Sequence, residues 1–120
     1  MGKVESRSLD KADETRSFPN GMAEMVTISG TMIGRARMEP GWRWSNDVKP
    51  IAGTEQCMIL HKGYVVSGAL VVRAEDGTET TVGAGDAYVI EPGHDAWVQG
   101  DEPYVAIDFS EQMAEYAKPM

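Results

Sequence analysis

Polar and apolar residues alternate with a two-residue period over much of the chain. The alternation runs from Met22 to Ser29 and again from Ile33 to Met38, which is the pattern of strands with one buried face. Further short strands are predicted at residues 42–44, 55–60, 64–66, 69–72, 80–82, 87–90, 96–99 and 104–109. Between them lie turn-forming pairs such as Asp76-Gly77 and Pro92-Gly93. Short strands at this spacing predict an all-β sandwich or barrel.

The two ends of the chain depart from this pattern. Residues 1–17 are polar, with four basic and four acidic side chains whose charges cancel. We interpret them as an N-terminal arm, and a frayed tail is the simpler alternative. Residues 18–120 then form a single domain, long enough for one hydrophobic core. Ser110 is a suitable N-cap for a short C-terminal helix over residues 111–118.

The composition narrows the classes of partner and location. Of the 120 residues 19 are acidic and 11 basic, and the net charge of −8 opposes binding to nucleic acid or to an anionic membrane. No apolar run approaches the ~18–20 residues of a membrane span, and the N-terminus lacks the apolar segment of a signal peptide. Cys57 is the single cysteine and cannot form an internal disulfide. It fits a reducing cytoplasm, or a task for that one thiol.

Two segments that end in glycine turns resemble conserved motifs of a known superfamily. The segment from Gly85 to Gly93, GDAYVIEPG, resembles the second motif of the cupins, and the segment from Tyr64 to Leu70 resembles the end of the first. Residues 40–45 and 92–97 look like a subgroup of small stand-alone bacterial cupins with no assigned reaction. The resemblance extends over about residues 25–109. It implies a double-stranded β-helix, or jelly-roll, barrel with a site inside it.

The resemblance also points to metal-ligand positions. In cupins, two histidines and a glutamate of the first motif and one histidine of the second hold a divalent metal ion. Counted back from the glycine that ends the first motif, these positions hold Glu55, Cys57 and His61 here. The second-motif position holds Ala96, and His94 lies two residues before it, on the same face of a regular strand. The candidate metal ligands are therefore Cys57, His61, His94 and Glu55.

The chemistry of these side chains indicates which ion they would bind. A thiolate with imidazoles favours zinc, with iron, nickel or manganese as other divalent ions. Glu55 has an alternative at the barrel rim, where it can pair with Arg43 or Lys49. Two further interpretations stay open. Cys57 packs as a small hydrophobe in a metal-free barrel, or His61 activates its thiol as a nucleophile, although the sequence identifies no third group to orient the histidine.

Large aromatic residues are candidates for a small-molecule site. Trp42, Trp44, Trp97 and Tyr88 are predicted to line a largely apolar ligand pocket at the barrel mouth, or to serve only as core. Three function classes remain: a metal-dependent enzyme acting on a small organic substrate, a non-catalytic ligand-binding or sensory cupin, and a metal-free structural barrel.

The early strands carry apolar residues that favour self-association. Met22, Met25, Met32, Ile33 and Met38 supply more apolar surface than one sheet edge should leave in water. Small cupins commonly pair through these strands, so the resemblance implies a homodimer. The polar arm would then cross to the partner.

Overall fold

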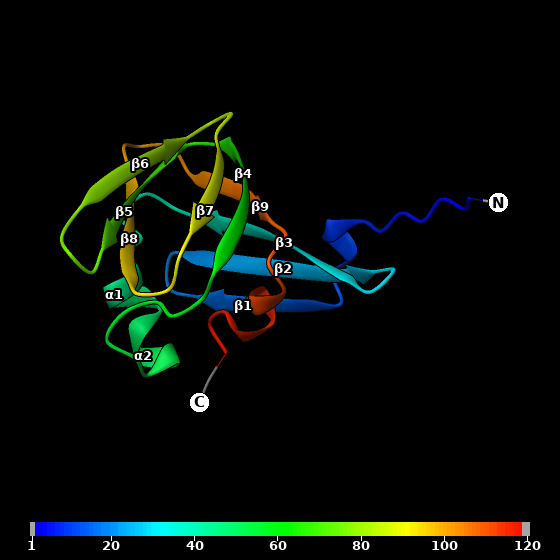
Figure 1. Ribbon diagram of the computed structural model, residues 1–120, viewed down its shortest axis with the longest axis horizontal. Coiled ribbons are helices and arrows are strands. Elements are labelled where there is room, and N and C mark those ends of the chain that lie inside the picture. Colours follow the sequence, from blue (N-terminus) through cyan, green and yellow to red (C-terminus); the bar gives the residue numbers. More distant parts are fainter. Residues whose placement is uncertain (1, 119–120) are drawn as a thin grey trace.

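Two antiparallel sheets form the body of the molecule (Figure 1). The computed structural model describes residues 2–118. The larger sheet has the strand order β1 (Glu14–Phe18), β2 (Gly21–Ile28), β3 (Thr31–Met38), β9 (Tyr104–Asp108), β4 (His61–Ser67), β7 (Ala87–Ile90). The smaller sheet has the order β6 (Glu79–Gly83), β5 (Ala69–Ala74), β8 (His94–Gln99). The helices are short: η1 (Leu9–Lys11) and η2 (Glu111–Glu115) are 3-10 helices, and α1 (Trp44–Asp47) and α2 (Lys49–Ala52) are α-helices. The all-β prediction is confirmed.

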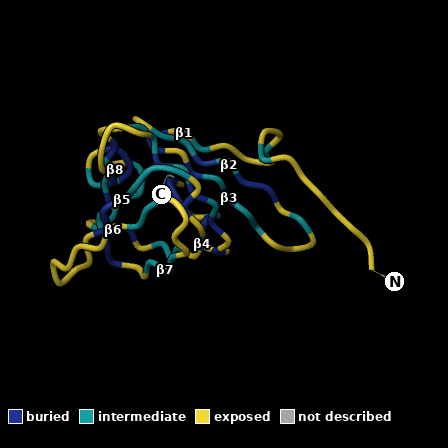
Figure 2. Tube along the Cα trace, turned by 90° about the horizontal axis from the view of Figure 1, so that it is seen from above, coloured by how far each residue is buried: buried dark blue, intermediate teal, exposed yellow. Residues whose placement is uncertain are grey.

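The inward faces of both sheets build one core. On β8, His94, Ala96 and Val98 are buried, and the residues between them are less so. Strand β9 repeats this pattern, with Asp108 at its last inward position. Figure 2 shows the result: buried positions follow the strands, whereas the N-terminal segment and the hairpin ends are exposed. The two-residue period of the sequence therefore places both apolar and polar side chains inside the barrel.

Gly63 allows β4 and β9 to approach closely. A Cβ atom at Gly63 would stand 2.0 Å from the Ile107 carbonyl oxygen and 2.7 Å from the Tyr88 hydroxyl oxygen. Only glycine fits there without moving the backbone. Gly63 pairs with Asp108 of β9, so this close approach also sets His61, two residues earlier, beside the Asp108 carboxylate.

The N-terminal arm is shorter than the predicted residues 1–17. Residues 14–17 belong to β1, which pairs with β2 over its whole length. Phe18 is the only buried residue of this edge strand, so its sequence shows little of the alternation that reveals other strands. Arg7 attaches the arm to the barrel by donating hydrogen bonds to the Asp13 carboxylate and the Thr27 carbonyl. The chain before Arg7 extends away from the body (Figure 1).

Residues 42–44, predicted as a strand, lead instead into α1. Arg43 is extended and bridges to Trp97 of β8. The helix begins at Trp44, where the Asp47 carboxylate accepts a hydrogen bond from the Arg43 backbone N–H at 3.0 Å. The prediction was wrong because an alternation over three residues is too short to separate a strand from the first turn of a helix.

Two other predicted elements also take different forms. Residues 55–60 are a loop, because no strand pairs with them apart from a single bridge between Cys57 and His94. At the other end, the predicted helix over residues 111–118 is the shorter 3-10 helix η2. Its N-cap is Ser110 as predicted, and the Ser110 hydroxyl accepts a hydrogen bond from the Gln112 N–H at 3.2 Å.

The residues predicted to face a partner divide between core and surface. Met25 and Met38 are 2% and 5% exposed and belong to the core, whereas Met22, Met32 and Ile33 are half-buried. The early strands thus present less apolar surface than the sequence suggested, and the homodimer stays a prediction. Within residues 2–118, no helix has the length and apolar character needed to cross a membrane.

Candidate functional site

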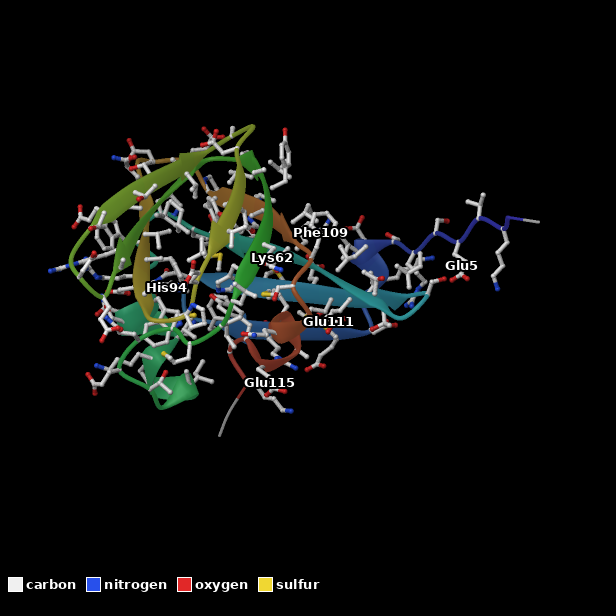
Figure 3. All side chains as sticks on the ribbon, in the orientation of Figure 1. Glu5, Lys62, His94, Phe109, Glu111 and Glu115 are labelled. Carbon is white, nitrogen blue, oxygen red and sulfur yellow. The ribbon has the colours of Figure 1, made fainter. Side chains whose placement is uncertain are left out.

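Three of the four predicted metal ligands converge in the interior. Cys57, His61 and His94 each offer one ligand atom, and these atoms lie within 4.8 Å of one another. His61 opens β4 and His94 opens β8, so the two imidazoles come from different sheets. Their rings meet edge to face, with 5.4 Å between centroids, and His94 is labelled in Figure 3. The predicted convergence of the three side chains is confirmed.

Backbone hydrogen bonds attach the Cys57 loop to the start of β8. The Cys57 N–H donates to the His94 carbonyl at 2.7 Å, and the Gly93 N–H donates to the Cys57 carbonyl at 2.8 Å. Gly93 has a φ of 94°, in the left-handed region that glycine adopts readily. The Pro92-Gly93 turn therefore sets the position of Cys57 as well as that of His94.

Hydrogen bonds orient both imidazoles. The Nδ1 atom of His94 lies 2.8 Å from the Glu91 carbonyl oxygen. A carbonyl only accepts, so Nδ1 is the donor in this hydrogen bond and Nε2 is left for the cluster. The Nδ1 atom of His61 lies 3.0 Å from an Asp108 carboxylate oxygen, and its Nε2 lies 3.7 Å from the Cys57 sulfur. Each ring thus uses Nδ1 for a fixed partner and leaves Nε2 for the cluster.

Asp108 is the functional residue that the sequence analysis missed. It is 3% exposed, and its second carboxylate oxygen accepts a hydrogen bond from the Ser110 N–H at 2.8 Å. A signal was present, because residue 108 has the inward parity of β9 and follows apolar inward positions. A charged side chain at such a position needs a buried partner, and that partner is His61.

The pKa values of Cys57 and His61 move in opposite directions. Burial opposes a charge on the Cys57 sulfur, but hydrogen bonds and positive charge from His61 and His94 outweigh it and lower the pKa of Cys57 to about 6. Burial also opposes a charge on His61, but hydrogen bonds to Asp108 and Cys57 outweigh it and raise the pKa of His61 to about 9. Without a metal, the pair is therefore a thiolate beside an imidazolium at neutral pH.

This donor set fits a zinc-type ion. A thiolate sulfur and two imidazole nitrogens are ligands that zinc and the later first-row ions prefer. Asp108 and the Glu91 carbonyl hold the other nitrogens of the two rings, which is the usual support for metal-bound histidine. Cys57, His61 and His94 are thus the residues that would hold the ion.

Glu55 does not join the cluster. Its side chain is 92% exposed, and its carboxylate accepts a hydrogen bond from the Lys49 ammonium group at 3.0 Å. The strand parity that placed Glu55 beside Cys57 fails, because residues 55–60 form a loop. The alternative pairing with Lys49, weighed from the sequence, is the one observed.

A small cavity adjoins the cluster. Its volume is about 50 Å³, and its lining is mostly apolar, with Trp42, Trp44 and Tyr88 among the side chains. Trp97 lies outside it: it occupies an outward position of β8, and the Arg43 guanidinium stands 4.3 Å from the centre of its ring. Three of the four aromatic residues predicted for a pocket therefore line this inner cavity, and Trp97 does not.

The C-terminal segment covers the inner cavity. Met113 and Tyr116 are 1% and 3% exposed and line it. The Arg16 guanidinium of β1 donates to the carbonyl oxygens of Ala114 and Tyr116 at 2.5 and 2.8 Å. The Leu60 N–H donates to the Gln112 side chain at 2.8 Å. In Figure 3, Glu111 and Glu115 mark the position of this segment.

Comparisons with known proteins bear on the fold. A family model described as the cupin domain matches residues 57–110. A protein of unknown function (DUF1255) from Acidithiobacillus ferrooxidans is 21% identical, with a TM-score of 0.60 over 82% of this chain and 88% of the other. A cupin 2 conserved barrel domain protein from Salinispora arenicola is 18% identical, with a TM-score of 0.60 over 95% of each chain.

One further structural neighbour has a specific name. KdgF from Halomonas sp. is 23% identical, with a TM-score of 0.53 over 79% of this chain and 84% of the other. No curated protein matches the sequence. Identities at this level establish a shared fold and leave function to the residues of the site.

Proposed function

We propose that this chain, which has the cupin fold and matches the cupin domain model over residues 57–110, binds a divalent transition-metal ion, zinc first, through Cys57, His61 and His94. The observation that carries the proposal is the convergence of one sulfur and two imidazoles within 4.8 Å. The hydrogen bonds to Asp108 and Glu91 support it, because they leave one nitrogen of each ring free for the ion.

The cavity beside the cluster is proposed to bind a small organic molecule. Three protein ligands are the number typical of catalytic zinc sites, which keep one position for water or substrate. A bound ion would supply Lewis-acid chemistry, while the apolar lining excludes water. Turnover of the bound molecule would identify an enzyme, and binding without turnover would identify a ligand-binding or sensory cupin.

Metal analysis of protein purified without a histidine tag tests the proposal. We expect about one ion per chain, and Cys57→Ser should abolish stoichiometric binding. Glu55→Gln is the matched control. Glu55 was the fourth candidate ligand, but its exposed side chain lies outside the cluster, so this variant should keep the full metal content. Full metal content in Cys57→Ser would remove the sulfur from the site.

A second candidate function rests on one observation. Cys57, His61 and Asp108 form a thiol–imidazole–carboxylate series, with 3.7 Å from sulfur to Nε2 and 3.0 Å from Nδ1 to the carboxylate. This is the arrangement of a nucleophilic cysteine with its base and an orienting group. We place it second, because it gives no role to His94, whose free nitrogen faces the same cluster.

Alkylation of Cys57 separates the two candidates. With a bound metal, iodoacetamide should react slowly until a chelator removes the ion. With a nucleophilic thiol and no metal, the chelator should change nothing, and Asp108→Asn should slow the reaction by weakening the base. A metal-free structural barrel should show neither the chelator effect nor the Asp108 effect.

A further inference from the structure

Two buried hydrogen-bond donors have no partner among residues 2–118. They are the Trp42 indole N–H and the Tyr116 hydroxyl. Both side chains are 3% exposed. A buried donor without an acceptor is rare, because its desolvation is not compensated. Both side chains line the inner cavity that adjoins Cys57, His61 and His94, so both lie where a bound molecule could reach them.

Aromatic contacts connect the two donors to the cluster. The Phe18 ring lies between them, with centroids 6.4 Å from Trp42 and 5.8 Å from Tyr116. The Tyr116 ring in turn meets His61 edge to face at 5.6 Å. These packed rings leave little freedom for either donor to turn elsewhere, so each needs an acceptor brought to it.

The chemistry of the donors limits what that acceptor can be. An indole N–H donates and never accepts. A tyrosine hydroxyl keeps its proton at neutral pH, because its ordinary pKa is about 10, so Tyr116 can donate as well. The two donors therefore favour a molecule that offers an oxygen acceptor.

We infer that the inner cavity recognises a small carbonyl or carboxylate compound, whose oxygen accepts hydrogen bonds from Trp42 Nε1 and the Tyr116 hydroxyl. This inference rests on the proposed function, because it names the class of molecule that binds beside the metal ligands. Other side chains of the lining, such as Met38 and Leu70, are apolar and suit a short hydrocarbon part.

The size of the space sets the size of the compound. About 50 Å³ corresponds to roughly three or four water-sized groups, enough for a molecule such as acetate or acetone. A second cavity, of about 230 Å³, shares Trp44, Cys57 and Tyr116 with the first. A longer chain would extend into this outer cavity, between the 53–60 loop and the C-terminal segment.

Nuclear magnetic resonance of the indole N–H groups tests the inference. The three tryptophans give three indole signals, assigned by single Trp→Phe variants. Zinc-loaded protein is titrated with acetate, with acetone and with isopropylammonium, which has a similar shape but offers no oxygen acceptor. We expect acetate or acetone to shift the Trp42 signal in a saturable way, and isopropylammonium to leave it unchanged. The Trp97 signal, on the outside of β8, should not move.

The outcomes are distinct. A response to acetate alone assigns a carboxylate, and a response to acetone alone assigns a neutral carbonyl. If neither moves the Trp42 signal, or if isopropylammonium moves it equally, the inference is wrong. Zinc content is measured on the same samples, so a protein that binds zinc and shows no shift overturns the inference while the proposed metal site stands. A saturable shift in protein that holds no zinc would support the inference and overturn the proposed metal site.

A variant pair isolates the hydroxyl. Tyr116→Phe should weaken the response to the active probe roughly tenfold, as expected for one lost buried hydrogen bond. Tyr64→Phe, on the exposed side of β4, should leave the affinity unchanged. The Trp44 and Trp97 signals report whether each variant is folded. Equal affinity in folded Tyr116→Phe would remove this residue from the site.

Discussion

At the residue scale, the site depends on how each histidine is held. His94 is oriented by a backbone carbonyl, which mutation of a side chain does not remove. His61 is oriented by the carboxylate of Asp108, which a single substitution can change. Substitution of Asp108 therefore offers a direct way to measure what the orientation of His61 contributes to the proposed metal binding.

Replacement of Asp108 by asparagine should lower zinc affinity about 10- to 100-fold, because outer partners of metal-bound histidines contribute that much. The amide keeps the shape but removes the charge that strengthens the imidazole as a ligand. Competition with a chelator of known affinity measures the change. Asp101→Asn, at an exposed turn, is the control and should bind zinc like the parent protein. Unchanged affinity in Asp108→Asn would show that His61 does not depend on this carboxylate.

In the metal-free protein, Cys57 should titrate in the range set by its lowered pKa. The ultraviolet absorbance of the thiolate should be lost as the pH falls through about 6, with Cys57→Ser as the blank. A midpoint near the ordinary cysteine value of 9.0 would contradict the close contact with His61. With zinc bound, acidification should instead release the ion, because protons compete for all three ligands.

The same pair predicts how stability depends on pH. The lowered pKa of Cys57 gives stability that is complete above pH 9.0 and lost as the pH falls to about 6. The raised pKa of His61 gives stability that is complete below pH 6.5 and lost as the pH rises to about 9. Between about 6.5 and 9 the two slopes have opposite signs and cancel. The contribution of this pair to the free energy of unfolding should therefore stay level in that window.

Cys57 and His61 could be predicted because they fall on ligand positions of the first cupin motif, which part of the chain resembles, and His94 because it shares a strand face with the second-motif position. Asp108 could not be assigned in the same way. Its role depends on β9 lying beside β4, and the two strands are separated by more than thirty residues of chain. Glu55 failed for a related reason: parity places a side chain only where a strand exists, and the 55–60 segment has no paired neighbour.

At the element scale, the C-terminal segment around η2 is held by side chains rather than by a sheet. Arg16 of β1 supplies two of its hydrogen bonds, to Ala114 and Tyr116. Because β1 is an edge strand with an almost entirely polar sequence, neither its existence nor this task could be predicted. The polar residues assigned to an arm thus include the one that holds the cover of the cavity.

Replacement of Arg16 by glutamine should loosen this cover. The Arg16 side chain is 11% exposed, and loss of its hydrogen bonds to the Ala114 and Tyr116 carbonyl oxygens should lower the free energy of unfolding by about 2 kcal/mol. In metal-free protein, Cys57 should also react faster with a thiol reagent, because Tyr116 stands between the two cavities. The measurements are urea unfolding and alkylation rate. Arg37→Gln, which removes an exposed pair with Glu39, should change neither. Equal behaviour of the two variants would mean that Arg16 does not hold the C-terminal segment over the cavity.

At the scale of the whole molecule, the proposed metal ligands come from three parts of the fold. Cys57 comes from a loop, His61 from the six-stranded sheet and His94 from the three-stranded sheet. An ion held by all three would bind the folded barrel and not the unfolded chain. Metal binding and folding of the entire domain should therefore be linked.

Removal of the metal should lower the melting temperature of the whole barrel. For an ion at one hundred times its dissociation constant, linkage gives about 2.7 kcal/mol, or roughly 10 °C for a domain of this size. Scanning calorimetry with and without a chelator measures the shift, and a single transition should move as a unit. Cys57→Ser in the same buffers is the control: its melting temperature should not respond to the chelator, because it has lost the sulfur ligand. A chelator shift of equal size in both proteins would mean that the stabilising ion binds elsewhere. If the melting temperature of the parent protein does not shift, the barrel holds no stabilising metal ion.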